Sequence, residues 1–259
     1  MDAKQCNMLK KWFSDYVEDV FIEDEKITAF IQLKLEHSIK VAESCRIFAT
    51  RMDWSQSDIY TAEVIGLFHD IGRFSQLVEY RTFADENSIN HGERGYRLIK
   101  QFGILSFLPE SGQSGILNGI RYHNSRYIPT HITTDSLPFL RLVRDADKLD
   151  IIRVIRSHIK NNRLEEHPEI ILNIDIDGPV NPDALKQILN KETVSYKNVK
   201  SLADFGLAQL AWIYDINYKV TFQEIIDGNI IDKITEFFPH IQEIQEVKQH
   251  VETYIMEKM

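Results

Sequence analysis

The sequence has little cysteine, glycine or proline. Its 259 residues include 2 cysteines, 11 glycines and 7 prolines. Because only Cys6 and Cys45 are present, there is no disulfide framework and no CxxC zinc motif, and we expect a reducing, cytoplasmic compartment. Few glycines and prolines leave few points at which a helix must end, and most long segments carry apolar residues three and four positions apart. The sequence therefore predicts a mainly α-helical, all-α protein.

The chain also lacks long apolar runs and an excess of positive charge. No run approaches the roughly 18 apolar residues that suggest a membrane span, and the N-terminal segment has no clean apolar core followed by a signal-peptide cleavage site. Lysine and arginine number 30 against 39 acidic residues, a net charge of −9. Because an acidic surface is a poor match for a phosphate backbone, we expect a small substrate rather than a nucleic-acid polymer or a membrane.

Apolar spacing and capping residues predict where the helices lie. One helix is expected over residues 24–52, and a second begins after Ser55, which can cap it together with Asp58. The second helix is predicted to end at Gly72 in a left-handed stop, and the polar, aperiodic residues 73–90 indicate a loop. Further helices are expected after the cap Asn90 and over residues 113–123, 137–159, 202–214 and from 230 onward.

One segment does not follow the helical pattern. Residues 170–177 alternate apolar and polar side chains and indicate a strand, with residues 194–199 as its candidate partner, so the chain could form one small β-hairpin. A soft boundary near residue 162 separates a helical core with an N-terminal helix, residues 1–162, from a helical C-terminal extension, residues 163–259. We expect the two parts to pack as one compact unit.

Polar residues occupy positions where helical spacing calls for apolar ones. His37 lies four residues before Val41 on an apolar stripe, and Asp147 lies four residues after Val143 and four before Ile151. The imidazole and the carboxylate should therefore both face the interior. Burial of a carboxylate is expensive unless it is paired or bound to a metal ion.

A histidine and an aspartate also stand together where the second apolar helix ends. His69 and Asp70 lie there within reach of a ligand. Each polar residue taken alone is more simply a hydrogen-bonded core residue or a helix cap. Four such residues on three predicted helices are instead typical of a divalent-metal site, and periodicity by itself leaves both interpretations open.

The order of these residues resembles that of a known family. His37, then His69 and Asp70 in the phrase GLFHDIGRF, then Asp147 in the phrase RDADKLDI, resemble the H…HD…D pattern of the HD-domain metal-dependent phosphohydrolases. The resemblance extends over about residues 36–155. It implies an HD-domain-like helical bundle in which these four residues bind a divalent transition-metal ion.

Two more histidines extend the resemblance. His91 opens a predicted helix and His123 closes another, and HD proteins with two metals share this H…HD…H…H…D order. The resemblance then implies that His91 and His123 bind a second ion and that Asp70 bridges the two. In members with one metal, equivalent histidines contact substrate phosphate instead. The resemblance therefore leaves open whether one ion or two bind. The metal can be manganese, iron, nickel, cobalt or zinc.

Two basic residues follow these motifs closely. Arg73 comes three residues after the HD pair, and Lys148 directly follows Asp147, so both can lie at the rim of the site and contact an anionic substrate. The alternative is that they form only salt bridges, for example with Asp145 or Asp150.

The resemblance implies a hydrolase that cleaves a small phosphorylated substrate, such as a nucleotide, with a metal-activated water. Asp70, Lys148 and Arg73 are the predicted catalytic residues, and His91 and His123 join Lys148 and Arg73 as predicted substrate-binding residues. Two alternatives are an HD-fold di-iron oxygenase and a non-catalytic nucleotide-binding or sensing module. The sequence does not determine the metal, the exact substrate or the oligomeric state.

Overall fold

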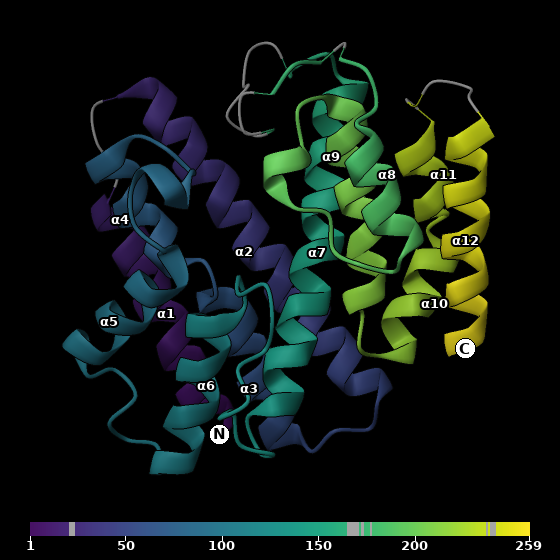
Figure 1. The fold of residues 1–259 in the computed structure, drawn as a ribbon. Coiled ribbons are helices and arrows are strands. Elements are labelled where there is room, and N and C mark those ends of the chain that lie inside the picture. The colour runs from purple at the N-terminus through teal and green to yellow at the C-terminus, as the bar shows by residue number, and fades with distance from the viewer. Residues whose placement is uncertain (21–23, 165–170, 172–173, 177, 237, 239–241) are drawn as a thin grey trace. The chain divides into compact units, whose positions relative to one another are not determined.

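The computed structural model describes residues 1–20, 24–164, 171, 174–176, 178–236, 238 and 242–259 (Figure 1). Within these residues the regular structure is helical and contains no strand, which confirms the all-α prediction. No helix in the described part of the chain is long and apolar enough to cross a membrane.

The chain divides into two compact units, residues 1–150 and 151–259, and the division falls inside helix α7 (Leu137–Lys160). The first unit also contains α1 (Ala3–Val20), α2 (Glu25–Arg51), α3 (Gln56–Phe68), α4 (Ile71–Tyr80), η1 (Asp85–Asn87), α5 (His91–Phe102) and α6 (Glu110–Tyr122). The domain boundary expected near residue 162 and the packing into one unit stay predictions.

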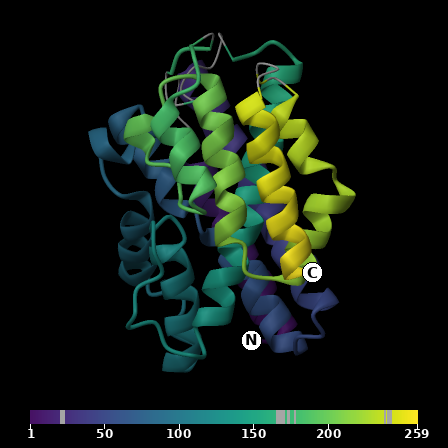
Figure 2. The ribbon, with the colours of Figure 1, turned by 45° about the vertical axis from the view of Figure 1, so that its right-hand side comes forward.

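The second unit continues from α7 with short helices. These are α8 (Pro182–Leu189), η3 (Tyr196–Asn198), α9 (Leu202–Ala211), η4 (Trp212–Asp215), α10 (Lys219–Asp227), α11 (Ile230–Thr235) and α12 (Gln242–Lys258). Helix α12 packs along α8, α10 and α11, as Figure 2 shows from the side. The predicted helices over 202–214 and from 230 onward are present, and α8 and α10 are additional.

The predicted caps of α2 and α3 are confirmed. Asp24 caps α2 by accepting a hydrogen bond from the backbone N–H of Ile27 at 3.1 Å, and Ser55 caps α3 by accepting one from Asp58. Helices α2 and α3 then pack very closely. A Cβ on Gly66 would lie 2.8 Å from the Cα of Ala42, so this crossing needs a glycine.

The prediction of a loop over residues 73–90 is wrong for its first half. Helix α3 ends at Phe68, and α4 begins again at Ile71. Ile71, Phe74 and Leu77 are fully buried and lie three residues apart, so a short apolar stripe anchors α4 between polar neighbours. The stripe is only two turns long, which is why the polar residues around it dominate the pattern.

The predicted left-handed stop at Gly72 is also wrong. Gly72 lies inside α4, and the only glycine with a positive φ among the described residues is Gly103, which ends α5. Gly72 instead allows α5 to approach α4, because a Cβ there would lie 2.1 Å from the carbonyl oxygen of His91. The glycine therefore helps to place His91.

The predicted β-hairpin is not formed by the described residues. Residues 194–199 contain η3, and within the described part of the chain the only isolated β-bridge is a parallel one between Asp175 and Ser201. Residues 170, 172–173 and 177 of the candidate strand lie outside the described residues. Just after residues 194–199, Ser201 and Asp204 form the capping box that starts α9, so the segment leads into a helix and not into a strand.

The close approach at Gly72 yields a test of the packing. Gly72→Ala should lower the free energy of unfolding by about 1–3 kcal/mol or more, because the added methyl group meets backbone that cannot rotate away. Gly112→Ala in α6 is the matched control, since its Cβ would have no neighbour closer than 3.8 Å. Urea unfolding followed by circular dichroism measures both, and equal stability of the Gly72 variant and the wild type would contradict the packing argument.

Candidate metal centre

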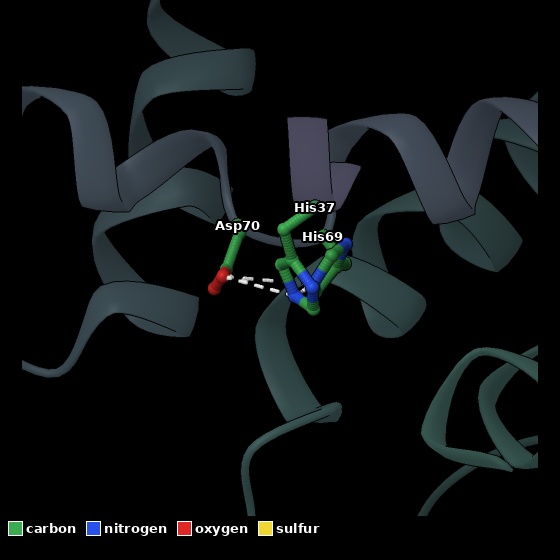
Figure 3. A group of neighbouring side chains, drawn as sticks. All are labelled: His37, His69 and Asp70. Atoms are coloured by element: carbon green, nitrogen blue, oxygen red, sulfur yellow. Dashed lines mark hydrogen bonds and ion pairs between the residues drawn. The ribbon is translucent and has the colours of Figure 1, made fainter. Parts of the chain in front are cut away.

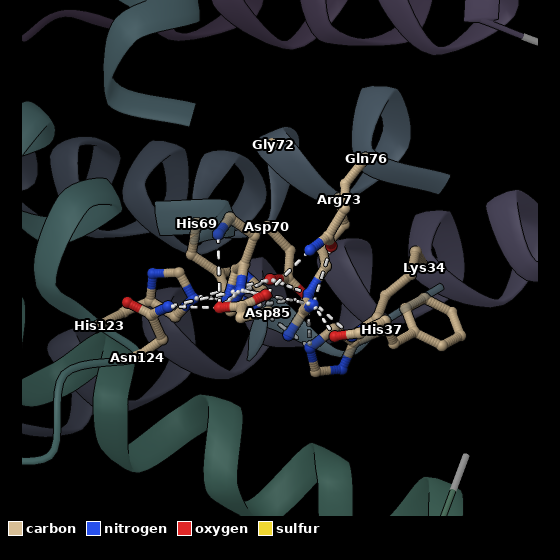
Figure 4. A network of polar contacts seen from close by, with 12 residues as sticks. Lys34, His37, His69, Asp70, Gly72, Arg73, Gln76, Asp85, His123 and Asn124 are labelled. Carbon is tan, nitrogen blue, oxygen red and sulfur yellow. Dashed lines mark hydrogen bonds and ion pairs between the residues drawn. The ribbon is translucent and has the colours of Figure 1, made fainter. Parts of the chain in front are cut away.

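The structure brings all six predicted ligands together in the first unit. Figure 4 labels His37, His69, Asp70 and His123 among them. The six come from the middle of α2, the junction of α3 and α4, the start of α5, the end of α6 and the first half of α7. The residues are His37, His69, Asp70, His91, His123 and Asp147. They form three overlapping groups, in each of which the candidate ligand atoms lie within 4.8 Å of one another.

One half of the centre is formed by two histidines and two carboxylates. The Nε2 atoms of His37 and His69 lie 3.1 Å apart. Asp147 Oδ1 lies 3.1 Å from His37 Nε2 and 3.6 Å from His69 Nε2. Asp70 Oδ2 lies 3.6 Å from both nitrogens. Figure 3 shows the Asp70 carboxylate beside the two rings.

The other half of the centre uses the second oxygen of the same aspartate. The Nε2 atoms of His91 and His123 lie 3.0 Å apart. Asp70 Oδ1 lies 3.3 Å from His91 Nε2 and 3.6 Å from His123 Nε2. Asp70 therefore presents one oxygen to each histidine pair, which is the arrangement of a carboxylate able to bridge two ions.

Hydrogen bonds at the far side of the rings determine where two of the imidazole protons lie. His69 Nδ1 donates to the carbonyl of Gly66 at 2.7 Å, and His123 Nδ1 donates to the carbonyl of Ile120 at 2.8 Å. A backbone carbonyl can only accept a hydrogen bond, so Nδ1 carries the proton. Nε2 of the neutral ring then carries a lone pair. Both lone pairs point into the centre.

The other two histidines have carboxylate partners instead. His37 Nδ1 lies 2.7 Å from Asp150 Oδ2, and His91 Nδ1 lies 2.7 Å from Asp85 Oδ2. Such outer carboxylates orient metal-binding histidines and increase their basicity. Nitrogen lone pairs that face carboxylates across distances of about 3 to 3.6 Å fit a divalent cation, because a cation would satisfy all of them.

The electrostatics keep the carboxylates charged. Burial raises the pKa of Asp70, but electrostatic interactions with Lys34 and His69 outweigh it and hold that pKa well below its usual value. For Asp147, burial likewise raises the pKa, and hydrogen bonds with His37 and His69 lower it well below its usual value. Both side chains therefore stay in the ionised form that a metal ion requires.

The pKa values of three of the histidines are shifted in different directions. Burial lowers the pKa of His69, and burial together with the charge of Arg73 lowers the pKa of His91 to about 3. Burial and Lys34 also lower the pKa of His37, but its hydrogen bonds with Asp147 and Asp150 outweigh them and raise it. His69 and His91 are thus neutral at pH 7 and able to bind a cation.

The structure places Arg73 beside the predicted ligands. Arg73 Nε lies 3.6 Å from Asp70 Oδ1, and Nη1 donates to Asp85 Oδ1 at 2.9 Å and to the carbonyl of Phe83. The salt-bridge alternative is thus present, with Asp85 as the partner. Lys148 is half-buried and donates to the carbonyl of Arg144 on its own helix, so its contact with substrate stays a prediction.

Sequence reasoning missed several residues around the centre. Lys34 Nζ donates to Asp70 Oδ2 at 2.7 Å, and it lies one helical turn before His37, a spacing that could have pointed to it. Asp85 and Asn124 lie 3.3 Å apart and both contact His91 Nδ1. No local pattern marks Asp85, because it lies in a polar segment and reaches His91 only through the fold.

Comparison with known proteins agrees with this geometry. A family model described as the HD domain matches residues 35–171, which is more than half of the chain and includes all six candidate ligands. Neither the curated proteins nor the solved structures gave a match.

Removal of a ligand should empty the centre. His69→Ala and Asp147→Ala should each weaken metal binding by more than the roughly 10- to 100-fold cost of losing an outer-shell partner. Metal content after gel filtration, measured by mass spectrometry, tests this, with Asp15→Asn at an exposed position of α1 as the control. A chelator should lower the melting temperature of the wild type but not of the ligand variants, because only the wild type has a bound ion to lose. Full metal content in either ligand variant would contradict the assignment.

Proposed function

The chain belongs to the HD-domain family of metal-dependent phosphohydrolases, and from this we propose that it hydrolyses a small phosphate ester, such as a nucleotide. The observation that carries the proposal is Asp70, whose two oxygens face two buried histidine pairs. Such a donor set suits a divalent transition metal better than a purely structural hydrogen-bond network, because lone pairs face one another within each pair.

In this proposal the chain's own residues divide the work of the site. His37, His69, Asp70 and Asp147 hold one ion, and His91 and His123 hold a second ion or contact the substrate phosphate. A bound divalent ion supplies a water of lowered pKa and polarises a phosphoryl oxygen. The hydrogen bonds at the Nδ1 atoms keep each ring in the orientation that this chemistry needs.

Cationic side chains offset the charge of the phosphate in the same proposal. Lys34 and Arg73 each approach one oxygen of Asp70, so both lie at the centre itself. Lys148 is expected at the rim, one position after Asp147. Fixed positive groups close to a phosphoryl group stabilise the charge of its transition state.

The direct test is turnover. Protein purified without chelator is analysed for metal and then assayed against phosphomonoesters and phosphodiesters, nucleotides included. We expect metal-dependent release of phosphate or alcohol that is lost in the Asp70→Asn variant. Iron-dependent oxygen consumption without phosphate ester hydrolysis would favour the oxygenase alternative, and metal-loaded protein that binds nucleotides without turnover would favour the binding module.

The number of ions can be decided by removing the second histidine pair. If His91 and His123 bind a second ion with Asp70, the double variant His91→Ala/His123→Ala should hold half the metal of the wild type. If they contact only substrate, the metal content should stay unchanged while KM rises. Metal stoichiometry and steady-state kinetics on the same preparation separate the two outcomes.

Lys148 is tested separately because its place at the rim is inferred from its position directly after Asp147. Lys148→Ala should keep its metal and lower kcat/KM for phosphate esters by roughly 10- to 1000-fold, the loss expected for one charged transition-state contact. If Lys148 is only structural, the melting temperature should fall while turnover per folded molecule is unchanged. Metal content, melting temperature and kcat/KM, measured on the same preparation, distinguish a substrate contact from a structural role.

A further inference from the structure

One aromatic ring contacts two of the cations at the metal centre. Lys34 Nζ lies 5.5 Å from the centroid of the Phe83 ring, and the Arg73 guanidinium carbon lies 5.9 Å from the same centroid. Both distances fall within the range of about 6 Å over which a cation is attracted to an aromatic face. Phe83 lies between α4 and η1, in the segment that the sequence pattern predicts as a loop.

The same two cations also approach the same carboxylate. Lys34 Nζ donates to Asp70 Oδ2 at 2.7 Å, and Arg73 Nε lies 3.6 Å from Asp70 Oδ1. The side chains of Lys34 and Arg73 are only 16% and 15% exposed, so both attractions act with little screening by water. Each cation is therefore held from two directions, by Asp70 and by the ring.

The ring itself is fixed by further contacts. It makes a T-shaped contact with Phe30 of α2, a buried residue, with the ring centroids 5.2 Å apart. The carbonyl of Phe83 accepts a hydrogen bond from Arg73 Nη1, which ties the loop to α4. Phe83 is thus supported by one helix that carries Lys34 and by another that carries Arg73.

We propose that Phe83 is a positioning residue that holds Lys34 and Arg73 side by side for the phosphate of the substrate. The inference rests on the proposed function and adds a source of affinity that no ligand residue supplies. Two positive groups near one phosphate repel each other, and the long lysine side chain has many other rotamers. Attraction to the same aromatic ring offsets both costs, so the pair is preorganised before an anion arrives.

The test replaces the ring without changing the metal ligands. Phe83→Leu keeps an apolar side chain but removes the π face, and Phe83→Tyr restores it. The affinity of metal-loaded protein for inorganic phosphate, measured by calorimetry, should fall about 5- to 30-fold in the leucine variant and return to within about 3-fold of the wild type in the tyrosine variant. KM for a phosphate ester should rise by the same factor, with kcat and metal content nearly unchanged.

Phe102→Leu is the matched control. Phe102 is 54% exposed on α5 and makes edge contacts with Trp12 and Tyr16, away from both cations. Its loss should leave phosphate affinity unchanged. A Lys34→Gln background adds a second measurement, because the cost of Phe83→Leu should shrink there if the ring acts through Lys34.

The outcomes separate this inference from the proposed function. Unchanged phosphate affinity in Phe83→Leu, no recovery in Phe83→Tyr, or an undiminished cost in the Lys34→Gln background would each overturn the role of Phe83. Wild-type protein with no affinity for phosphate would overturn it as well. Phosphate binding that depends on Phe83 without any ester hydrolysis would support the inference and contradict only the proposed hydrolase.

Discussion

The buried carboxylate of Asp70 is the group on which the arrangement of the first unit depends. An isolated buried carboxylate is costly unless other groups compensate its charge. Here two histidine pairs and two cations, Lys34 and Arg73, surround it. These partners come from α2 to α6, so much of the helix packing in this unit serves to bring charge and lone pairs to one short side chain.

Glycines and helix ends make that convergence possible. Gly66 lets α3 approach α2, and Gly72 lets α5 approach α4, at distances that any Cβ would prevent. His69 and His123 both follow the last residue of a helix and bond a carbonyl three residues earlier, so the same local device orients both rings. A histidine that ends a helix in this way cannot turn its Nε2 away from the centre without losing the hydrogen bond.

The candidate centre has two layers with different tasks. The inner layer contains the histidine nitrogens and carboxylates that could hold a metal ion. The outer layer contains the groups that orient the histidine rings or place a charge beside the inner residues. Asp85 belongs to the outer layer twice, because it contacts both His91 and Arg73. Burial raises the pKa of Asp85, but its hydrogen bond and electrostatic interaction with His91, together with the charge of Arg73, lower that pKa to about 2, so Asp85 stays ionised. The loop between α4 and α5 is therefore part of the site.

The sequence by itself determined the helical class and the starts of α2 and α3, because each depends on spacing or capping within one segment, and it picked out the six residues that the fold gathers as candidate ligands. His37 and Asp147 were recognisable as polar residues on apolar stripes, and the HD pair by its place at a helix end. Only the tertiary structure revealed the contacts of Phe83, Gly72 and the outer carboxylates with the centre. Their partners lie on other helices, so no local periodicity records them, and α4 shows how polar neighbours conceal a short buried stripe.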